Sequence, residues 1–292
     1  MHIHINKNGV TLIELMIAML IAAIIMASLI GILSGQRKGY ISQQARAEAE
    51  ESVTRVHGEL MDRIRMAGYM IPDGYNAITP YSATSGPDSI KIVGNYDNFT
   101  SLTFLNTPKY SENFFAKDAP NFKYTPGMRV MLISPLAEEV DTCWATVDTF
   151  IKFMFSGSKF IYFTLQDSLD RYMPKESRVS SFNEYTYKVA YDINGTDTLR
   201  YFGVRYNNDS NIIRLVENID DIQITYETRI DTTDMDTFSP DSMDFIYAVN
   251  LDVQSRSSIK DREYTDSIYN DNYRRSRLNT QAVILNIALD KR

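Results

Sequence analysis

The chain of 292 residues has very little cysteine and histidine. Its single cysteine, Cys143, excludes an intrachain disulfide, although it does not exclude an oxidising compartment. Of the three histidines, His2 and His4 precede the first apolar run and only His57 follows it. The chain therefore lacks the side chains for a histidine-rich metal site or a nucleophile–histidine pair in its C-terminal part.

Glycine-rich phosphate loops and dinucleotide fingerprints are also missing from the sequence. The net charge of −7 and the pI near 5.1 argue against a broad basic surface for nucleic acid. The length allows one large or two small domains with a real core, and 19 Tyr and 14 Phe favour β-strands. We therefore expect no enzyme, no cofactor and no nucleic-acid partner.

The N-terminal part contains an apolar run, residues 15–33, in which no side chain is charged. As a helix it would be about 28 Å long, close to one bilayer crossing. A secretory signal peptide fits poorly, because the run exceeds the usual about 7–15 residues and only Lys7 precedes it as a basic residue. A plain membrane anchor explains the length but not Glu14, because a carboxylate at the edge of the lipid is costly.

Small residues recur every four positions along this run and just beyond it. They are Ala23, Ala27, Gly31, Gly35 and Gly39. This spacing predicts a helix face on which another helix backbone can approach closely. The alternative is that these residues only make a flexible neck.

The helical periodicity continues beyond the apolar run as an amphipathic helix. Its apolar positions are Ile41, Ala45, Ala49, Val53, Val56, Leu60, Ile64 and Ala67. Glu51–Arg55 and Glu59–Arg63 are i,i+4 pairs, which we interpret as part of a solvated face. Gly68 and Pro72 mark the end of the helix.

Gly9 followed by Val10-Thr11-Leu12-Ile13-Glu14 and an apolar helix resembles the N-terminal signal of type IV pilins and of type II secretion pseudopilins. The resemblance implies that a prepilin peptidase cuts between Gly9 and Val10 and that the new amine of Val10 is methylated. It also implies that Glu14 pairs with the N-terminal amine of a neighbouring subunit, which would give the carboxylate a partner.

Two further segments are similar to the PilW group of minor pilins, which are relatives of the J-type minor pseudopilins. One is Arg65-Met66-Ala67-Gly68-Tyr69, and the other is Tyr273-Arg274-Arg275-Ser276-Arg277 leading into residues 282–286. This resemblance implies a subunit in the inner membrane, with its globular domain in the periplasm, that reaches the pilus or cell surface after assembly. The implied partners are other minor and major pilins, the prepilin peptidase and the inner-membrane assembly platform.

After Pro72 the sequence turns to short alternating runs broken by Asn, Asp, Gly and Ser, which indicates an antiparallel sheet. The expected strands lie at 89–93, 101–105, 129–134, 143–147, 160–165, 185–191, 199–206, 212–216, 222–226, 249–253 and 283–289. Asn194-Gly195 and Asn207-Asn208 predict hairpin turns. The expected fold is α+β and pilin-like: a long helix, with a transmembrane half and an amphipathic half, packed on an antiparallel sheet domain.

Several groups of residues have the side chains of a possible binding site. Asp192, Asn194 and Asp197 space oxygen ligands as a calcium loop would, but a plain hairpin turn is favoured. The acidic stretch 231–244 is better read as a solvated loop. The arginines at 274, 275 and 277 could grip phosphates, but a strand edge guarded against aggregation is favoured. Cys143 is expected in the core, and His57 on the surface or in packing.

The sequence therefore predicts a leader at 1–9, a helix at 10–70 whose membrane part is about 12–35, and a β-rich domain at 71–292. The expected function is that of a PilW-type minor pilin that helps initiate or cap a type IV pilus. A minor pseudopilin of type II secretion shares the same N-terminal chemistry. Rivals of other classes are an adhesin or DNA-uptake tip protein and a membrane-anchored enzyme.

Overall fold

The computed structural model describes residues 12–69, 76–83, 86–96, 100–119, 126–135, 142–194, 197–207, 209–228, 232–233 and 246–284. These residues form one long helix and a set of antiparallel sheets, an α+β arrangement as predicted. The chain divides into two compact units, Met1–Ala49 with Ser257–Arg275, and Glu50–Arg256 with Ser276–Arg292.

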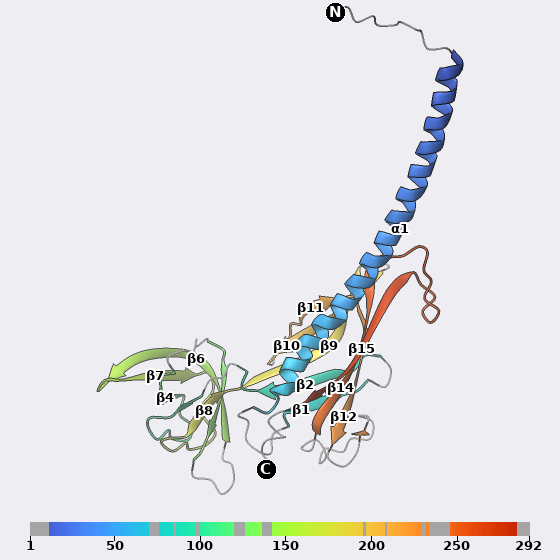
Figure 1. Ribbon diagram of the computed structural model, residues 1–292. Coiled ribbons are helices and arrows are strands. Elements are labelled where there is room, and N and C mark those ends of the chain that lie inside the picture. The colour runs from blue at the N-terminus through green and yellow to red at the C-terminus, as the bar shows by residue number, and fades with distance from the viewer. Residues whose placement is uncertain are drawn as a thin grey trace, which may run out of the picture. The chain divides into compact units, whose positions relative to one another are not determined.

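The helix α1 runs without interruption over Leu12–Arg65, 54 residues (Figure 1). It ends where the sequence predicts, because Gly68 has a φ of 74°, a left-handed conformation that glycine adopts without steric cost. The ion pairs predicted on its polar face both form, Glu51–Arg55 at 2.5 Å and Glu59–Arg63 at 3.2 Å.

The strands form three sheets. In spatial order, the first contains β1 (Ile78–Tyr81), β2 (Ser89–Gly94), β9 (Asn183–Asn194), β10 (Asp197–Tyr206) and β11 (Ile213–Glu217). The second contains β13 (Thr232–Thr233), β12 (Ile219–Thr228), β14 (Ile246–Lys260) and β15 (Tyr273–Val283). The third contains β3 (Thr100–Leu102), β8 (Arg178–Ser181), β5 (Arg129–Ile133), β6 (Thr142–Phe155), β7 (Ser158–Leu165) and β4 (Asn113–Lys117).

The main core lies between the C-terminal part of α1 and the first two sheets. Val53, Val56, Leu60, Ile64 and Ala67, all on the predicted apolar face, are at most 1 % exposed. Their partners come from both sheets and include Ile90, Ile92, Phe202, Ile222, Leu251 and Val253. The predicted packing of the amphipathic helix on a sheet is therefore confirmed.

The six-stranded sheet has a core of its own, in which Phe114, Val130, Cys143, Ile161 and Phe163 are buried. A small cluster joins this sheet to the first, because Val93 of β2 packs with Met131 and Phe182. Glu184 adds to this junction, with Lys91 at 3.5 Å and Arg129 at 3.7 Å.

The prediction for the last strand is wrong at its start. The expected strand 283–289 began at Val283, but β15 already begins at Tyr273 and ends at Val283; residues 285–289 lie outside the described part. The arginine-rich segment lies within this strand, and its arginines meet carboxylates, such as Asp252 of β14, which binds Arg277.

Other strands differ in extent. β1, β4, β8 and β13 were not expected, and β6 and β14 are longer than expected. β14 continues through polar sequence because Ser255 and Ser257 alternate into buried positions. The β9–β10 hairpin closes at Asn194 opposite Asp197 as expected, and Asn207 has a φ of 51°, which suits a turn residue.

Candidate functional site: the N-terminal helix

The first half of α1 exposes an apolar surface around its whole circumference. Every large apolar side chain from Leu12 to Leu33 is 51 to 76 % exposed. The most apolar 18-residue window of the helix has a mean hydropathy of 2.8. By length and composition the helix is able to cross a membrane, and such a surface needs a nonaqueous environment.

Polar side chains within this segment are satisfied by the helix backbone. The Ser28 hydroxyl donates to the carbonyl of Ile24 at 2.9 Å, and the Ser34 hydroxyl donates to the carbonyl of Ile30 at 2.8 Å. Because lipid offers no hydrogen-bond partners, these bonds reduce the cost of placing the two hydroxyls in a bilayer.

Glu14 lies in the first turn of α1 with its side chain exposed. A carboxylate is favourable in a first helical turn because the backbone N–H groups there are not used by the helix. Gly9 and Val10, the predicted cleavage site, lie outside the described residues.

The stripe of small residues lies on the helix surface. Ala23 and Ala27 are exposed, and a Cβ added at Gly31, Gly35 or Gly39 would meet nothing within 4 Å. Packing within the described chain therefore does not require these glycines, and the stripe is sterically open to another helix.

The loop between β14 and β15 is tied to α1 just after the apolar run. Lys38 forms an ion pair with Glu263 at 2.5 Å, which raises the pKa of Lys38. Arg274 donates to the Ser42 hydroxyl at 3.2 Å and to Asp261 at 3.0 Å. These bonds link the helix neck to the loop within one compact unit.

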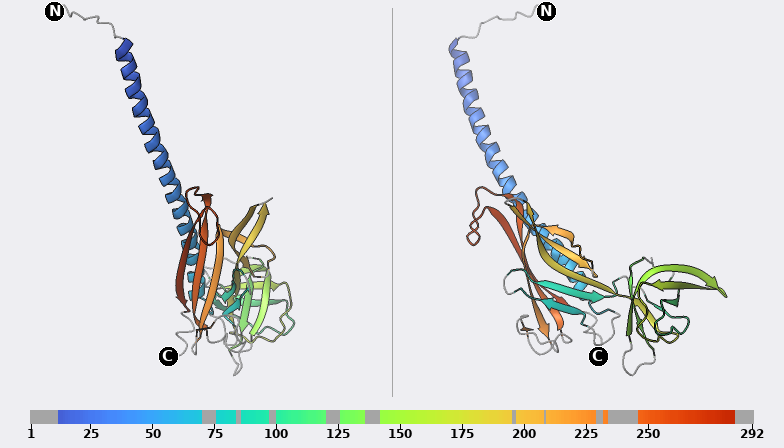
Figure 2. Two further views of the ribbon diagram at one scale, coloured as in Figure 1. Left: turned by 90° about the vertical axis from the view of Figure 1, so that its right-hand side faces the viewer. Right: turned by 180° about the vertical axis from the view of Figure 1, so that it is seen from behind.

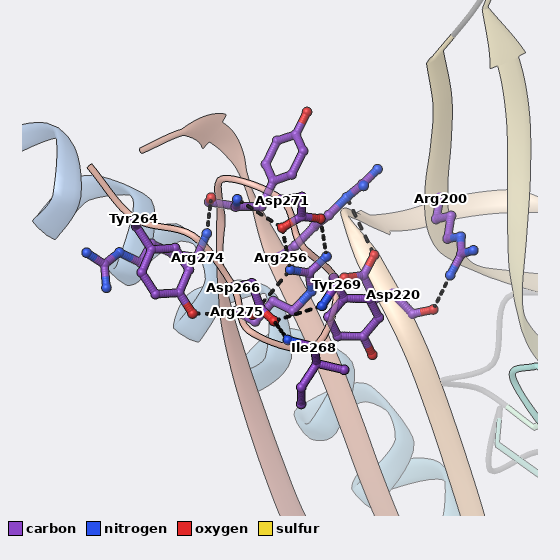
Figure 3. Close-up of polar contacts among 12 residues, drawn as sticks. Arg200, Asp220, Arg256, Tyr264, Asp266, Ile268, Tyr269, Asp271, Arg274 and Arg275 are labelled. Carbon is purple, nitrogen blue, oxygen red and sulfur yellow. Dashed lines mark hydrogen bonds and ion pairs between the residues drawn. The ribbon is translucent and has the colours of Figure 1, made fainter. Parts of the chain in front are cut away.

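Arg275 organises the same loop (Figure 3). It forms two hydrogen bonds of 2.7 Å with Asp271, lies 3.4 Å from Asp266 and stacks over Tyr269 at 3.8 Å. The N–H groups of Ile268 and Tyr269, together with Arg275, lower the pKa of Asp266.

Arg274, Arg275 and Arg277 all face carboxylates, and β15 is the last strand of its sheet. Phosphate binding by this segment has no support in this geometry.

A second polar cluster holds α1 on the first sheet, and here the solvated-face interpretation is wrong. The Tyr187 hydroxyl donates to Glu59 at 2.7 Å, and Arg63 lies over the Tyr185 ring at 4.4 Å. The Tyr96 hydroxyl donates to the carbonyl of Arg63 at 2.8 Å. Burial raises the pKa of Tyr187 well above its ordinary value, and the hydrogen bond to the Glu59 carboxylate raises it further. The sequence could not show this, because Tyr96 follows β2 and Tyr185 and Tyr187 lie in β9, far from the helix along the chain.

Replacing Tyr187 with Phe tests this cluster. The change keeps the ring, which is 1 % exposed, and removes only the hydroxyl bonded to a carboxylate. We expect the free energy of unfolding to fall by about 1 to 2 kcal/mol in urea denaturation of the detergent-solubilised protein. Tyr247→Phe is the matched control, because its hydroxyl also bonds a glutamate, Glu227, but at an exposed site. Equal effects of the two variants would contradict the role of Tyr187.

The candidate calcium ligands are only partly described. Asp192 is partly exposed and forms an ion pair with Arg214, while the side chains of Asn194 and Asp197 lie outside the described part. Within that part no group of His, Cys, Asp or Glu side chains is arranged to hold a metal ion. The acidic stretch 231–244 also falls almost wholly outside it.

Cys143 lies in the core of the third sheet, as expected, and is fully buried. Its thiol donates to Asp170 at 2.9 Å, and burial, with this bond, raises the pKa of the thiol to about 11. Such a thiol is a poor nucleophile at neutral pH.

His57 is partly buried, and burial and the nearby Arg65 lower its pKa. Its Nε2 has no hydrogen-bond partner among the described residues.

The comparisons with known proteins bear on this helix alone. Residues 5–30 match the prokaryotic N-terminal methylation motif. No curated protein matches the chain, and no solved structure does. Together with the long apolar helix, the motif supports a membrane-anchored, single-pass protein that is a type IV pilin or a pseudopilin. Proteins with this signal interact in general with other pilins and with prepilin peptidase, and they are typically structural rather than catalytic.

Proposed function

We propose that this protein is a minor pilin of the PilW type that helps initiate or cap assembly of a type IV pilus. The observation that carries the proposal is the methylation motif on a helix whose first half is apolar and exposed on all sides. Such a surface suits lipid before assembly and the packed helices of a filament afterwards.

In this proposal the residues of the helix have separate roles. The leader 1–9 is removed between Gly9 and Val10, the amine of Val10 is methylated, and Glu14 pairs with the amine of a neighbouring subunit. The stripe from Ala23 to Gly39 is the surface of close helix contact. The sterically open glycines in the stripe support this role.

The remaining chain, 71–292, acts as a globular domain in the periplasm and determines which subunits lie beside it. The helix 10–70 crosses the inner membrane at about 12–35, and after assembly the protein reaches the pilus or the cell surface. Its partners are other minor and major pilins, the prepilin peptidase and the assembly platform. The polar cluster around Glu59 and Tyr187 supports a firm link between helix and domain, because it adds directional bonds to the apolar contact.

Deletion of the gene in the host tests the role in the pilus. We expect the number of surface pili, counted by electron microscopy, and twitching motility to fall sharply, with protein secretion unchanged. Expression of the wild-type chain should restore both. Normal pili with lost secretion would contradict the proposal and support a pseudopilin of type II secretion.

A further inference from the structure

The hairpin of β6 and β7 ends in an exposed apolar tip, defined here as residues 151–159 and called the β6–β7 tip. Ile151 is 62 %, Met154 67 % and Phe155 62 % exposed. The hairpin extends as a two-stranded ribbon beyond the other strands of its sheet (Figure 2). Large apolar side chains at the end of a projection are unusual for a surface that stays in water.

The tip carries these side chains on both faces of the ribbon. Ser156 and Gly157 have φ values of 48° and 80°, which suits a tight two-residue hairpin turn. Because side chains alternate along a strand, Ile151 and Phe155 lie on one face and Met154 on the other.

The base of the hairpin is firmly packed. Phe160 is 4 % exposed and stacks against Phe153 with ring centroids 5.8 Å apart. Phe104 lies 4.3 Å from Phe160, and Phe115 lies 6.0 Å from Phe153. These aromatic contacts fix the position of the hairpin, so the β6–β7 tip loses little conformational entropy when it binds.

The charge around the tip is positive, although the whole chain is at −7. Between Thr149 and Ile161 the charged residues are Lys152 and Lys159. Lys117 adds a third lysine, because it lies opposite Phe160 in the sheet. Lys152 pairs with Asp118 at 3.3 Å; within the described residues Lys117 and Lys159 have no carboxylate partner.

We propose that the β6–β7 tip inserts into the headgroup region of a lipid bilayer that contains anionic lipids. A bilayer surrounds a projection from every side, so it covers apolar groups on both faces of the ribbon, whereas a flat protein surface covers one face. Lys117 and Lys159 then meet lipid phosphates beside the inserted side chains.

The β9–β10 hairpin provides a comparison within the same chain. Its end also exposes large apolar side chains, Tyr191 at 67 % and Ile193 at 71 %. Asp192 lies between them and shares Arg214 with Glu217, so these three groups carry a net charge of −1, which an anionic surface repels. The inference does not depend on the proposed pilus function, because it concerns a contact made by the sheet domain.

The test uses the full chain held in nanodiscs of neutral phosphatidylcholine through its apolar helix. Ser158→Cys, at the exposed tip, carries an environment-sensitive dye, while buried Cys143 stays unlabelled. Vesicles of phosphatidylcholine alone, or with phosphatidylglycerol, are then added. We expect the dye fluorescence to rise and shift to the blue with the anionic vesicles, and to change little with the neutral ones.

Variants define which residues are responsible. Phe155→Ser should weaken vesicle binding about tenfold or more, and Lys117→Gln and Lys159→Gln about fivefold each. Met154→Ser provides a second apolar deletion should Phe155→Ser fail to fold, and Ile193→Ser, the matched control, should bind as the wild type does. An unchanged signal with every vesicle, or an equal loss in Ile193→Ser, overturns the proposal. A signal that appears only with purified partner pilins also overturns it, in favour of a protein partner.

Discussion

Replacing Glu14 with Ala is expected to remove the subunit from assembled filaments while leaving it in the membrane. The proposed partner of Glu14 is the N-terminal amine of the next subunit. Without the carboxylate that amine would be an unpaired charge in an apolar environment, at a cost of about 3 kcal/mol or more, which corresponds to over a hundredfold. The amount of the subunit in the membrane should stay the same, because the variant removes a charged side chain from the edge of the lipid.

The measurement is the fraction of the subunit recovered in sheared filaments relative to the membrane fraction. Glu14→Gln should fail as Glu14→Ala does, because it keeps the shape and removes the charge. Glu51→Ala is the matched control on the same helix, since its ion pair with Arg55 is exposed and contributes little. Normal incorporation of Glu14→Ala would show that neighbour pairing is not the role of this residue.

Leu60→Ala should destabilise the fold by about 3 to 5 kcal/mol. Leu60 is fully buried between α1 and the first two sheets, so the change removes apolar contact and leaves a cavity. Urea denaturation in detergent, monitored by circular dichroism, measures this loss as a lower urea concentration at the midpoint of unfolding.

Asp62→Ala is the control for Leu60→Ala, because Asp62 lies two residues away on the exposed side of the helix. It should change the free energy of unfolding by less than about 0.5 kcal/mol. A loss below about 1 kcal/mol for Leu60→Ala would mean that the helix face does not form the centre of this core.

The helix could be predicted closely because its pattern is local. The apolar run, the four-residue steps from Ala45 to Ala67 and Gly68 are all read within a few turns, and they recur in the structure. The strands with clear alternation, such as 222–226 and 249–253, were also predicted, since one buried face leaves a period-two signal.

What the sequence could not show depends on contacts between distant segments. Arg274 and Arg275 lie in β15, and the loop before this strand folds so that Asp261, Asp266 and Asp271 contact them. Glu59 and Arg63 are half-buried because Tyr96, which follows β2, and two tyrosines of β9 meet them, whereas the local spacing indicates only a solvated pair. The β6–β7 tip was missed because its Ser156-Gly157 turn is a weaker signal than Asn-Gly.

The central claim is that the N-terminus is processed as a pilin signal and that the helix behind it drives assembly. Mass spectrometry of the N-terminus of the intact protein, isolated from its host, tests it most directly. The account predicts a chain that begins at Val10 with a methylated amine. A chain that retains Met1–Gly9 would contradict it, because the amine proposed to pair with Glu14 would not exist.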